Sequence, residues 1–126
     1  MKYETSKHLL HLDEMDAHHK EFVDIYNSIC KDDEEAYKNV MIKILEQTKV
    51  HFCHEEELMQ KHNYPRIKEH SDEHKKVLHE MQYFIDKAHT VFGKNMLKSY
   101  YNEALPNWFD SHLLSMDSDL ASFLKK

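Results

Sequence analysis

The sequence predicts an all-α protein, with residues 1–126 forming a single antiparallel up-down-up-down four-helix bundle that has a short N-terminal arm. Two observations predict this fold. One Gly and two Pro among 126 residues, with 40% hydrophobic and 32% charged residues, are typical of long helices joined by short connections. In addition, apolar residues repeat at spacings of three and four over about 13–30, 34–61, 65–91 and 95–124, with only short polar breaks between them.

Composition limits the classes of partner and compartment. The net charge of −6 favours solubility and is unfavourable for binding nucleic acid or an anionic membrane. No apolar run approaches the ~20 residues of a membrane span, and residues 1–12 are too polar for a secretory signal. Cys30 and Cys53 are too few for a disulfide framework. We therefore expect a cytoplasmic protein without nucleic-acid or membrane partners. We also expect a monomer rather than an oligomer.

The first helix is expected to follow an N-terminal arm, residues 1–12, in which no period is visible. Asp13 is the expected N-cap of this helix. The apolar stripe that follows contains one polar residue, His19, which is predicted to point into the core. Because a single core histidine is usually a hydrogen-bonded structural residue, His19 alone does not indicate a metal site.

The second helix is expected to begin near Glu34, capped by Asp32 or Asp33, and its inner face contains two polar residues. His51 and Glu55 are four residues apart and therefore lie on one face of the helix. Burying an unpaired carboxylate is costly, so Glu55 must have a partner. The two side chains either pair with each other or bind a metal ion at the seam of a helical bundle.

The third helix contains a His-x-x-x-His pair, His70 and His74, that is predicted to face the core. With 12 histidines in the chain, about one such pair is expected by chance, so the pair has no meaning alone. Asn63 is expected to close the preceding helix in the left-handed conformation, and Pro65 to lie in the first turn of this one. Gly93, the only glycine, is expected to end it.

The fourth helix places His112 on its inner face. Pro106 interrupts this helix, which predicts a kink one turn before His112. Asp117 follows His112 by five residues, about 140° round an ideal helix. The helical period therefore does not pair Asp117 with His112.

The inward polar residues of all four helices are predicted to meet at one end of the bundle, because odd and even helices run in opposite directions. Five imidazoles and two carboxylates in one core are hard to explain as structure alone. Imidazole and carboxylate groups suit iron and other intermediate divalent metals. The seven candidate metal ligands are His19, His51, Glu55, His70, His74, His112 and Asp117.

Four motifs spread over nearly the whole chain connect these residues. They are Asp16-x-x-His19, His51-Phe52-x-x-Glu55-Glu56-x-x-Met59, Tyr64-Pro65-x-x-x-x-His70-x-x-x-His74 and Trp108-x-x-x-His112-Leu113-x-x-x-Asp117. With these motifs in this order, the chain resembles the hemerythrin family, specifically its single-domain bacterial members.

The resemblance implies a non-haem centre of two Fe ions joined by an oxo or hydroxo bridge. It also implies a ligand assignment: His70, His74 and His112 on one iron, His19 and His51 on the other, and Glu55 and Asp117 as bridges. Dioxygen would bind reversibly at the two-histidine iron and be held there as hydroperoxide. The implied function is oxygen storage, delivery or protection by a protein that is not an enzyme.

A dry apolar pocket would favour release of the oxygen. The candidates for lining it are Phe22, Phe52, Trp108, Phe109 and Leu113. Two other classes remain open, a di-iron oxidase or peroxidase and a sensor of oxygen, nitric oxide or iron. The histidine-rich ligand set argues against strong oxidation chemistry, and a sensor would normally need a signalling domain, for which 126 residues leave no room. The other histidines are expected at the surface, namely His8, His11, His18, His54, His62, His79 and His89.

Overall fold

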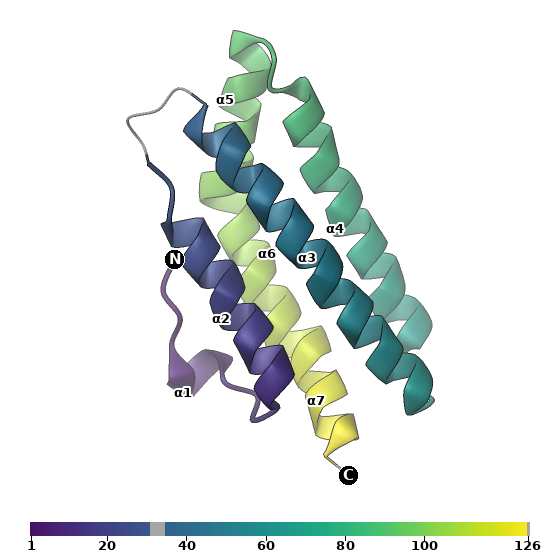
Figure 1. The fold of residues 1–126 in the computed structure, drawn as a ribbon. Coiled ribbons are helices and arrows are strands. Elements are labelled where there is room, and N and C mark those ends of the chain that lie inside the picture. The colour runs from purple at the N-terminus through teal and green to yellow at the C-terminus, as the bar shows by residue number, and fades with distance from the viewer. Residues whose placement is uncertain (31–34, 126) are drawn as a thin grey trace.

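The fold was determined from a computed structural model, which describes residues 1–30 and 35–125. Within this part of the chain every regular element is helical, and four antiparallel arms form one bundle, as predicted (Figure 1). The expected cap of the second helix at Asp32 or Asp33 lies outside the described residues.

The described residues form nine helical elements, and all of these except α1 belong to the four arms. In chain order the elements are α1 (Thr5–His8), α2 (Asp13–Asn27), α3 (Ala36–Lys61), α4 (Ile67–Lys87), α5 (Val91–Ser99), η1 (Tyr100–Ala104), α6 (Leu105–His112), η2 (Leu113–Asp117) and α7 (Ser118–Leu124). α2, α3 and α4 are the first three arms, and the continuous run from α5 to α7 is the fourth. The segments η1 and η2 are π-helical. In the described part of the chain, no helix has the length and apolar character that crossing a membrane requires.

The start of α2 differs from the prediction. Leu12, not Asp13, occupies the N-cap position, and no side chain caps the helix there. Asp16, one turn into the helix, instead accepts the backbone N–H groups of Leu10 at 2.7 Å and Leu12 at 3.1 Å. The carboxylate that binds the backbone at this helix start therefore belongs to Asp16, inside the first turn. The prediction of Asp13 as N-cap was wrong.

The connection between α3 and α4 confirms one prediction and corrects another. Asn63 has a φ of 53°, the left-handed conformation expected of a residue that closes a helix. The backbone N–H of Tyr64 then donates to the carbonyl of Met59 at 2.9 Å, which satisfies one of the last carbonyls of α3. Because α4 begins only at Ile67, Pro65 lies in the turn and not in the first turn of the helix.

Gly93 does not end the third arm. α4 ends at Lys87, and Gly93 lies in the first turn of α5, where its N–H donates to the Oγ1 of the N-cap residue Thr90 at 2.9 Å. A Cβ on Gly93 would lie 1.7 Å from the Lys87 carbonyl oxygen. The glycine is therefore required by the close approach of two arms, and the boundary between these arms falls at 88–90 instead of 92–94.

The fourth arm continues through Pro106, with η1 ending two residues before it, and the kink expected there stays a prediction. In η1 the N–H of Leu105 donates to the carbonyl of Tyr100, five residues back. The carbonyl of Tyr101 accepts the hydroxyl of Tyr26 at 2.9 Å, so a side chain from α2 replaces the hydrogen bond that the proline cannot make. Pro106 itself lies within the first turn of α6.

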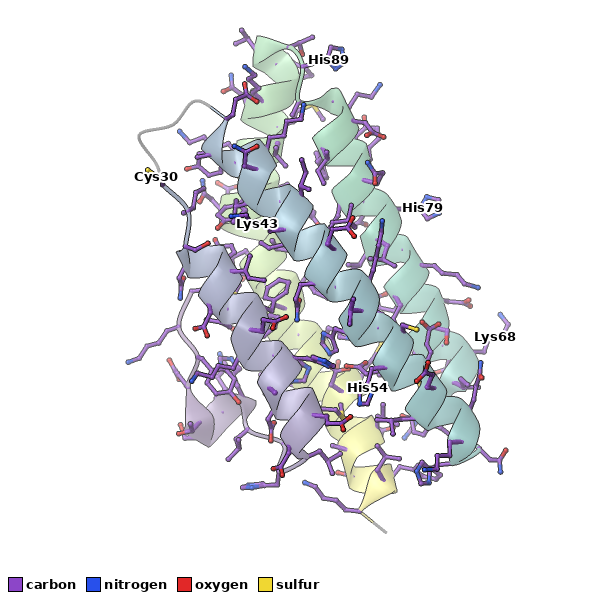
Figure 2. The ribbon with its side chains drawn as sticks, in the orientation of Figure 1. Cys30, Lys43, His54, Lys68, His79 and His89 are labelled. Carbon is purple, nitrogen blue, oxygen red and sulfur yellow. The ribbon has the colours of Figure 1, made fainter. Side chains whose placement is uncertain are left out.

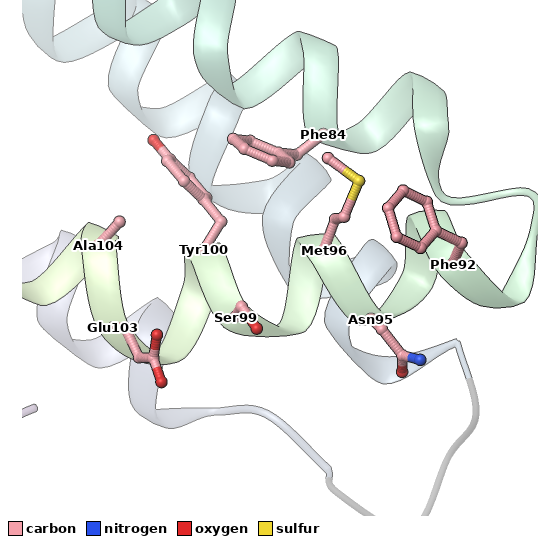
Figure 3. Close-up of a pocket in the computed structure, with 8 residues that line it drawn as sticks. All are labelled: Phe84, Phe92, Asn95, Met96, Ser99, Tyr100, Glu103 and Ala104. Carbon is pink, nitrogen blue, oxygen red and sulfur yellow. The ribbon is translucent and has the colours of Figure 1, made fainter.

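An apolar groove lies where α4 meets α5 and η1, and Figure 3 shows the side chains that line it. It is an open cavity of about 470 Å³. The rings of Phe84 and Tyr100 stack at 4.5 Å between centroids, and the Tyr100 hydroxyl is buried without a hydrogen-bond partner. Phe92 at the rim is 76% exposed. No residue of this groove belongs to the candidate metal ligands.

Candidate metal centre

Seven buried side chains from all four arms meet in one cluster, as the sequence predicted. None is more than 5% exposed. Their donor atoms form two groups, each within 4.8 Å, that share the two carboxylates. We call the set the donor cluster. Its three-histidine half consists of His70, His74 and His112, its two-histidine half consists of His19 and His51, and Glu55 and Asp117 belong to both groups.

Glu55 divides its two oxygens between the halves. Its Oε1 lies 3.2 Å from the Nε2 of His70 and 3.2 Å from the Nε2 of His74. Its Oε2 faces the other way, in close contact with the Nε2 of His51 and 3.9 Å from the Nε2 of His19. One carboxylate on α3 thus contacts imidazoles of both halves.

Asp117 repeats this division from the fourth arm. Its Oδ1 lies 3.1 Å from the Nε2 of His70 and 3.2 Å from the Nε2 of His112. Its Oδ2 lies 2.9 Å from the Nε2 of His19. Each carboxylate therefore presents one oxygen to each half, which is the arrangement of a group that bridges two cations.

The π segment η2 explains how Asp117 reaches the cluster. An ideal α-helix would place it about 140° from His112, and the helical period gave no reason to pair the two. In η2 the N–H of Ser118 donates to the carbonyl of Leu113, five residues back. Because a π turn brings residues i and i+5 into register, Asp117 lies over His112. Only the family resemblance had placed it there.

Within the donor cluster, nearby imidazoles favour the ionised form of the two carboxyl groups. Burial raises the pKa of both carboxyl groups, but the imidazoles around them outweigh it, so the pKa values of Glu55 and Asp117 lie below their usual range. Burial lowers the pKa of His70, yet its hydrogen bond to Asp117 and the nearby charge of Glu55 raise it to about 9. Burial lowers the pKa of His74, and its contact with Glu55 does not reverse this effect.

Several donor atoms in the cluster have no hydrogen-bond partner despite being buried. They are Oε1 and Oε2 of Glu55 and the Nε2 atoms of His51, His74 and His112. Buried polar atoms without partners are costly and rare in folded proteins. Because these atoms converge and belong to nitrogen and oxygen ligand types, a cation in each half would satisfy them. The residues present therefore fit a pair of metal ions.

Aromatic rings cover the three-histidine half. Phe52 stacks on His74 with centroids 3.7 Å apart, and Trp108 stacks on His112 at 5.0 Å. The indole Nε1 of Trp108 donates to Glu73 at 3.1 Å, a partner that the sequence motifs did not indicate. These contacts fix the planes of two imidazole rings.

Aromatic rings also cover the two-histidine half. Phe109 faces His19 edge-on at 6.0 Å and stacks on Phe22 at 4.6 Å. Leu113 is 1% exposed. The four aromatic candidates for an oxygen pocket therefore lie beside an imidazole or stack on a ring that does, and Leu113 directly follows His112 in the chain. Their role in holding dioxygen stays a prediction.

His8 was expected at the surface, and this prediction was wrong. It is 2% exposed, its Nδ1 accepts the backbone N–H of Glu4, and its Nε2 lies 2.9 Å from Asp110. Its ring faces Phe109 at 5.9 Å. Because the N-terminal arm has no apolar period, the sequence contained no signal that α1 packs beside the cluster.

Comparison with known proteins identifies the family. A scan against protein families matches residues 10–124 to the hemerythrin HHE cation binding domain. Searches of curated proteins and of solved structures returned no match. The family's cation-binding description agrees with a buried cluster of histidines and carboxylates that is suited to two metal ions. Since the match covers nearly the whole chain, this protein belongs to the hemerythrin HHE cation-binding family.

Proposed function

We propose that this chain is a single-domain hemerythrin of the bacterial kind that binds dioxygen reversibly at two iron ions, for storage, delivery or protection. The observation that carries the proposal is the division of the carboxylate oxygens. Glu55 and Asp117 each direct one oxygen to the three-histidine half and one to the two-histidine half. Two bridging carboxylates and five imidazoles, without a thiolate, are ligands that favour iron over a structural zinc ion.

The unequal halves support binding of an external ligand at one metal. The three-histidine half presents five donor residues and the two-histidine half four. In the proposed assignment His19 and His51 hold the metal that keeps a free position. When bound, a pair of ferrous ions supplies the electrons that dioxygen takes up and returns on release.

The chain's own residues contribute exclusion of water. Phe22 and Phe109 are 2% and 4% exposed and stack beside His19. An apolar wall at this place would keep water and protons from the bound oxygen, and protons promote irreversible oxidation of the metals. This supports reversible binding, so we propose that the protein is not an enzyme.

The proposal also covers the compartment, the partners and the oligomeric state of the protein. Cys30 and Cys53 are both free and exposed, which supports a reducing, cytoplasmic setting. We propose dioxygen as the partner, with no nucleic acid or membrane, and a monomer as the working form.

Metal content and oxygen cycling test the proposal. Purified protein should contain two irons per chain, and the reduced form should gain a coloured adduct with oxygen that disappears under argon and returns on re-exposure. His51→Ala should abolish the adduct while the helix content by circular dichroism is retained. His79→Ala, which changes an exposed histidine outside the donor cluster, is the matched control and should cycle like the wild type.

Two results would contradict the proposal. A folded protein that binds no iron pair would remove its basis. Continuous oxygen consumption in the presence of a reductant, ending in the ferric state, would instead identify a di-iron oxidase.

A further inference from the structure

Trp108 lies at the boundary between the two halves of the donor cluster. Its indole stacks on His112 with the ring planes 20° apart, and it also contacts Phe52 at 6.1 Å and Phe22 at 6.5 Å between centroids. Phe52 covers the three-histidine half, where it stacks on His74. Phe22 belongs to the aromatic cover of the two-histidine half. One side chain therefore contacts the covers of both halves.

Trp108 is also the ring of this cover that reaches solvent. The three phenylalanines of the cover, Phe22, Phe52 and Phe109, are at most 4% exposed. Trp108 is only half-buried and packs against the core from its edge. An indole in such a place presents its apolar body to the interior and its polar edge to water. The orientation of this ring therefore decides whether water reaches the imidazoles behind it.

Glu73 on α4 holds the polar edge of the indole. The Nε1 of Trp108, its only polar side-chain atom, donates to the Oε1 of Glu73 at 3.1 Å. Other polar side chains of α4 face outward, and Figure 2 shows Lys68 and His79 directed away from the bundle. Glu73 differs from them because it is half-buried and contacts a neighbouring arm. A carboxylate acceptor also makes a stronger hydrogen bond than a neutral group does.

We propose that Glu73 is a positioning residue that holds Trp108 closed over both halves of the donor cluster and thereby limits the access of water to the bound metals. Glu73 is not a member of the donor cluster and acts through the indole. The sealing of the metals against water rests on the proposed function. The positioning of Trp108 does not, because its hydrogen bond and ring contacts belong to the chain itself.

Tryptophan fluorescence of the full chain, as purified and after removal of metal, tests the positioning. Trp108 is the only tryptophan, so the signal comes from this ring alone. In Glu73→Leu the emission should shift to longer wavelength, and quenching by acrylamide should increase about twofold or more, because the indole loses its acceptor. Glu73→Gln keeps an acceptor oxygen and should stay close to the wild type. Glu69→Leu removes an exposed carboxylate one turn earlier on α4 and is the matched control, which should be unchanged.

The lifetime of the coloured oxygen adduct tests the sealing. Loss of a hydrogen bond to a carboxylate should raise the population of the open indole roughly 10-fold, so the adduct of Glu73→Leu should persist for about one tenth of the wild-type time. Glu73→Gln should restore the lifetime to within about threefold of the wild type. In a Trp108→Phe background, where the N–H is absent, Glu73→Leu should shorten the lifetime no further. Circular dichroism checks the fold, and if Glu73→Leu does not fold, Glu73→Ala removes the same acceptor and decides.

The outcomes separate the positioning from the sealing. Unchanged emission and quenching in Glu73→Leu, or the same change in Glu69→Leu, overturns the positioning. An adduct of Glu73→Leu that lasts as long as that of the wild type, or a further loss in the Trp108→Phe background, overturns the sealing. A protein that binds no iron pair contradicts the proposed function and the sealing together, whereas a fluorescence change confined to Glu73→Leu still supports the positioning.

Discussion

The fourth arm contains two π-helical segments, η1 and η2, and they have different causes. Each inserts one extra residue into an otherwise α-helical run. η1 precedes a proline, and the backbone chemistry of that proline accounts for it. η2 has no proline, and its extra residue places the carboxylate of Asp117 among imidazoles from three arms. One irregularity is therefore visible in the local sequence, and the other appears only in the assembled site.

η1 is closed by a reciprocal contact with the first arm. In the π register the carbonyl of Tyr101 would accept from residue 106, but Pro106 has no N–H. The hydroxyl of Tyr26 takes this place at 2.9 Å, and the hydroxyl of Tyr101 donates in return to the carbonyl of Tyr26. Their rings stack at 4.2 Å. The pair ties α2 to the fourth arm through neutral groups.

η2 is held by charged groups instead. Asp117, its last residue, contacts His19, His70 and His112 within 2.9–3.2 Å. These imidazoles come from three different elements, α2, α4 and α6. The register of η2 therefore depends on the donor cluster, and changes to that register should have the largest effects.

Inserting one alanine between Leu114 and Ser115 should break the donor cluster. Asp117 would be rotated by roughly 100° away from His112, and the imidazoles would lose a buried carboxylate. Breaking such a pair should lower the free energy of unfolding by about 3–5 kcal/mol. Metal analysis should find fewer than two ions per chain, and chemical denaturation measures the stability.

Deleting Leu114 is the matched control. This residue is 45% exposed, and its removal leaves the aspartate four residues after His112, on the same face of an ordinary α-helix. Metal content should stay at the wild-type value. If the deletion loses as much metal as the insertion, η2 does not act by adjusting the register, and the contrast with η1 fails.

The same contrast explains how far the sequence could predict this protein. The five histidines and Glu55 were placed correctly because each lies in a regular α-helix, where the 3.6-residue period holds. The 3.6-residue period could not predict the position of Asp117, because a π turn has a different number of residues per turn. The predictions for Asp13 and Gly93 were wrong because more than one residue near a helix end can make the hydrogen bonds there. In both cases a neighbouring side chain, Asp16 or Thr90, made the hydrogen bonds.

A rise in pH should weaken the imidazole–carboxylate contacts that hold η2 and should leave the tyrosine pair at η1 unchanged. The pKa of His70 in the metal-free fold is raised to about 9, and that of His51 is also raised. The stabilisation from a raised histidine pKa is fully present below the unfolded value of about 6.5 and is lost as pH rises through the folded value. The metal-free protein should therefore lose up to about 3 kcal/mol between pH 6.5 and 9.5.

Thermal unfolding of the metal-free protein at several pH values measures this loss. The pKa values of Tyr26 and Tyr101 are raised by burial, so the pair at η1 stays neutral over the whole range. His70→Gln should flatten the dependence. Bound metal should oppose the loss, because protons compete with metal for the same nitrogens and metal affinity rises with pH. A stability that rises from pH 6.5 to 9.5 in the metal-free wild type would contradict the assignment.

The smallest expected effect concerns the hydroxyl at η1. Tyr26→Phe removes the partner of the buried Tyr101 carbonyl and should cost about 1–3 kcal/mol of unfolding free energy, with metal content unchanged. Tyr83→Phe, on a tyrosine that is 49% exposed, is the control and should be close to neutral.

Combining Tyr26→Phe with Pro106→Ala tests whether the proline is the cause. Alanine at 106 restores an N–H five residues after Tyr101, which can donate to the same carbonyl in the π register. In that background the cost of Tyr26→Phe should fall below about 1 kcal/mol, a coupling that a double-mutant cycle of denaturation curves resolves. Additive costs would mean that residue 106 and Tyr26 do not serve one carbonyl. η1 would then need a cause other than its proline, and the difference between the two π segments would lose its physical basis.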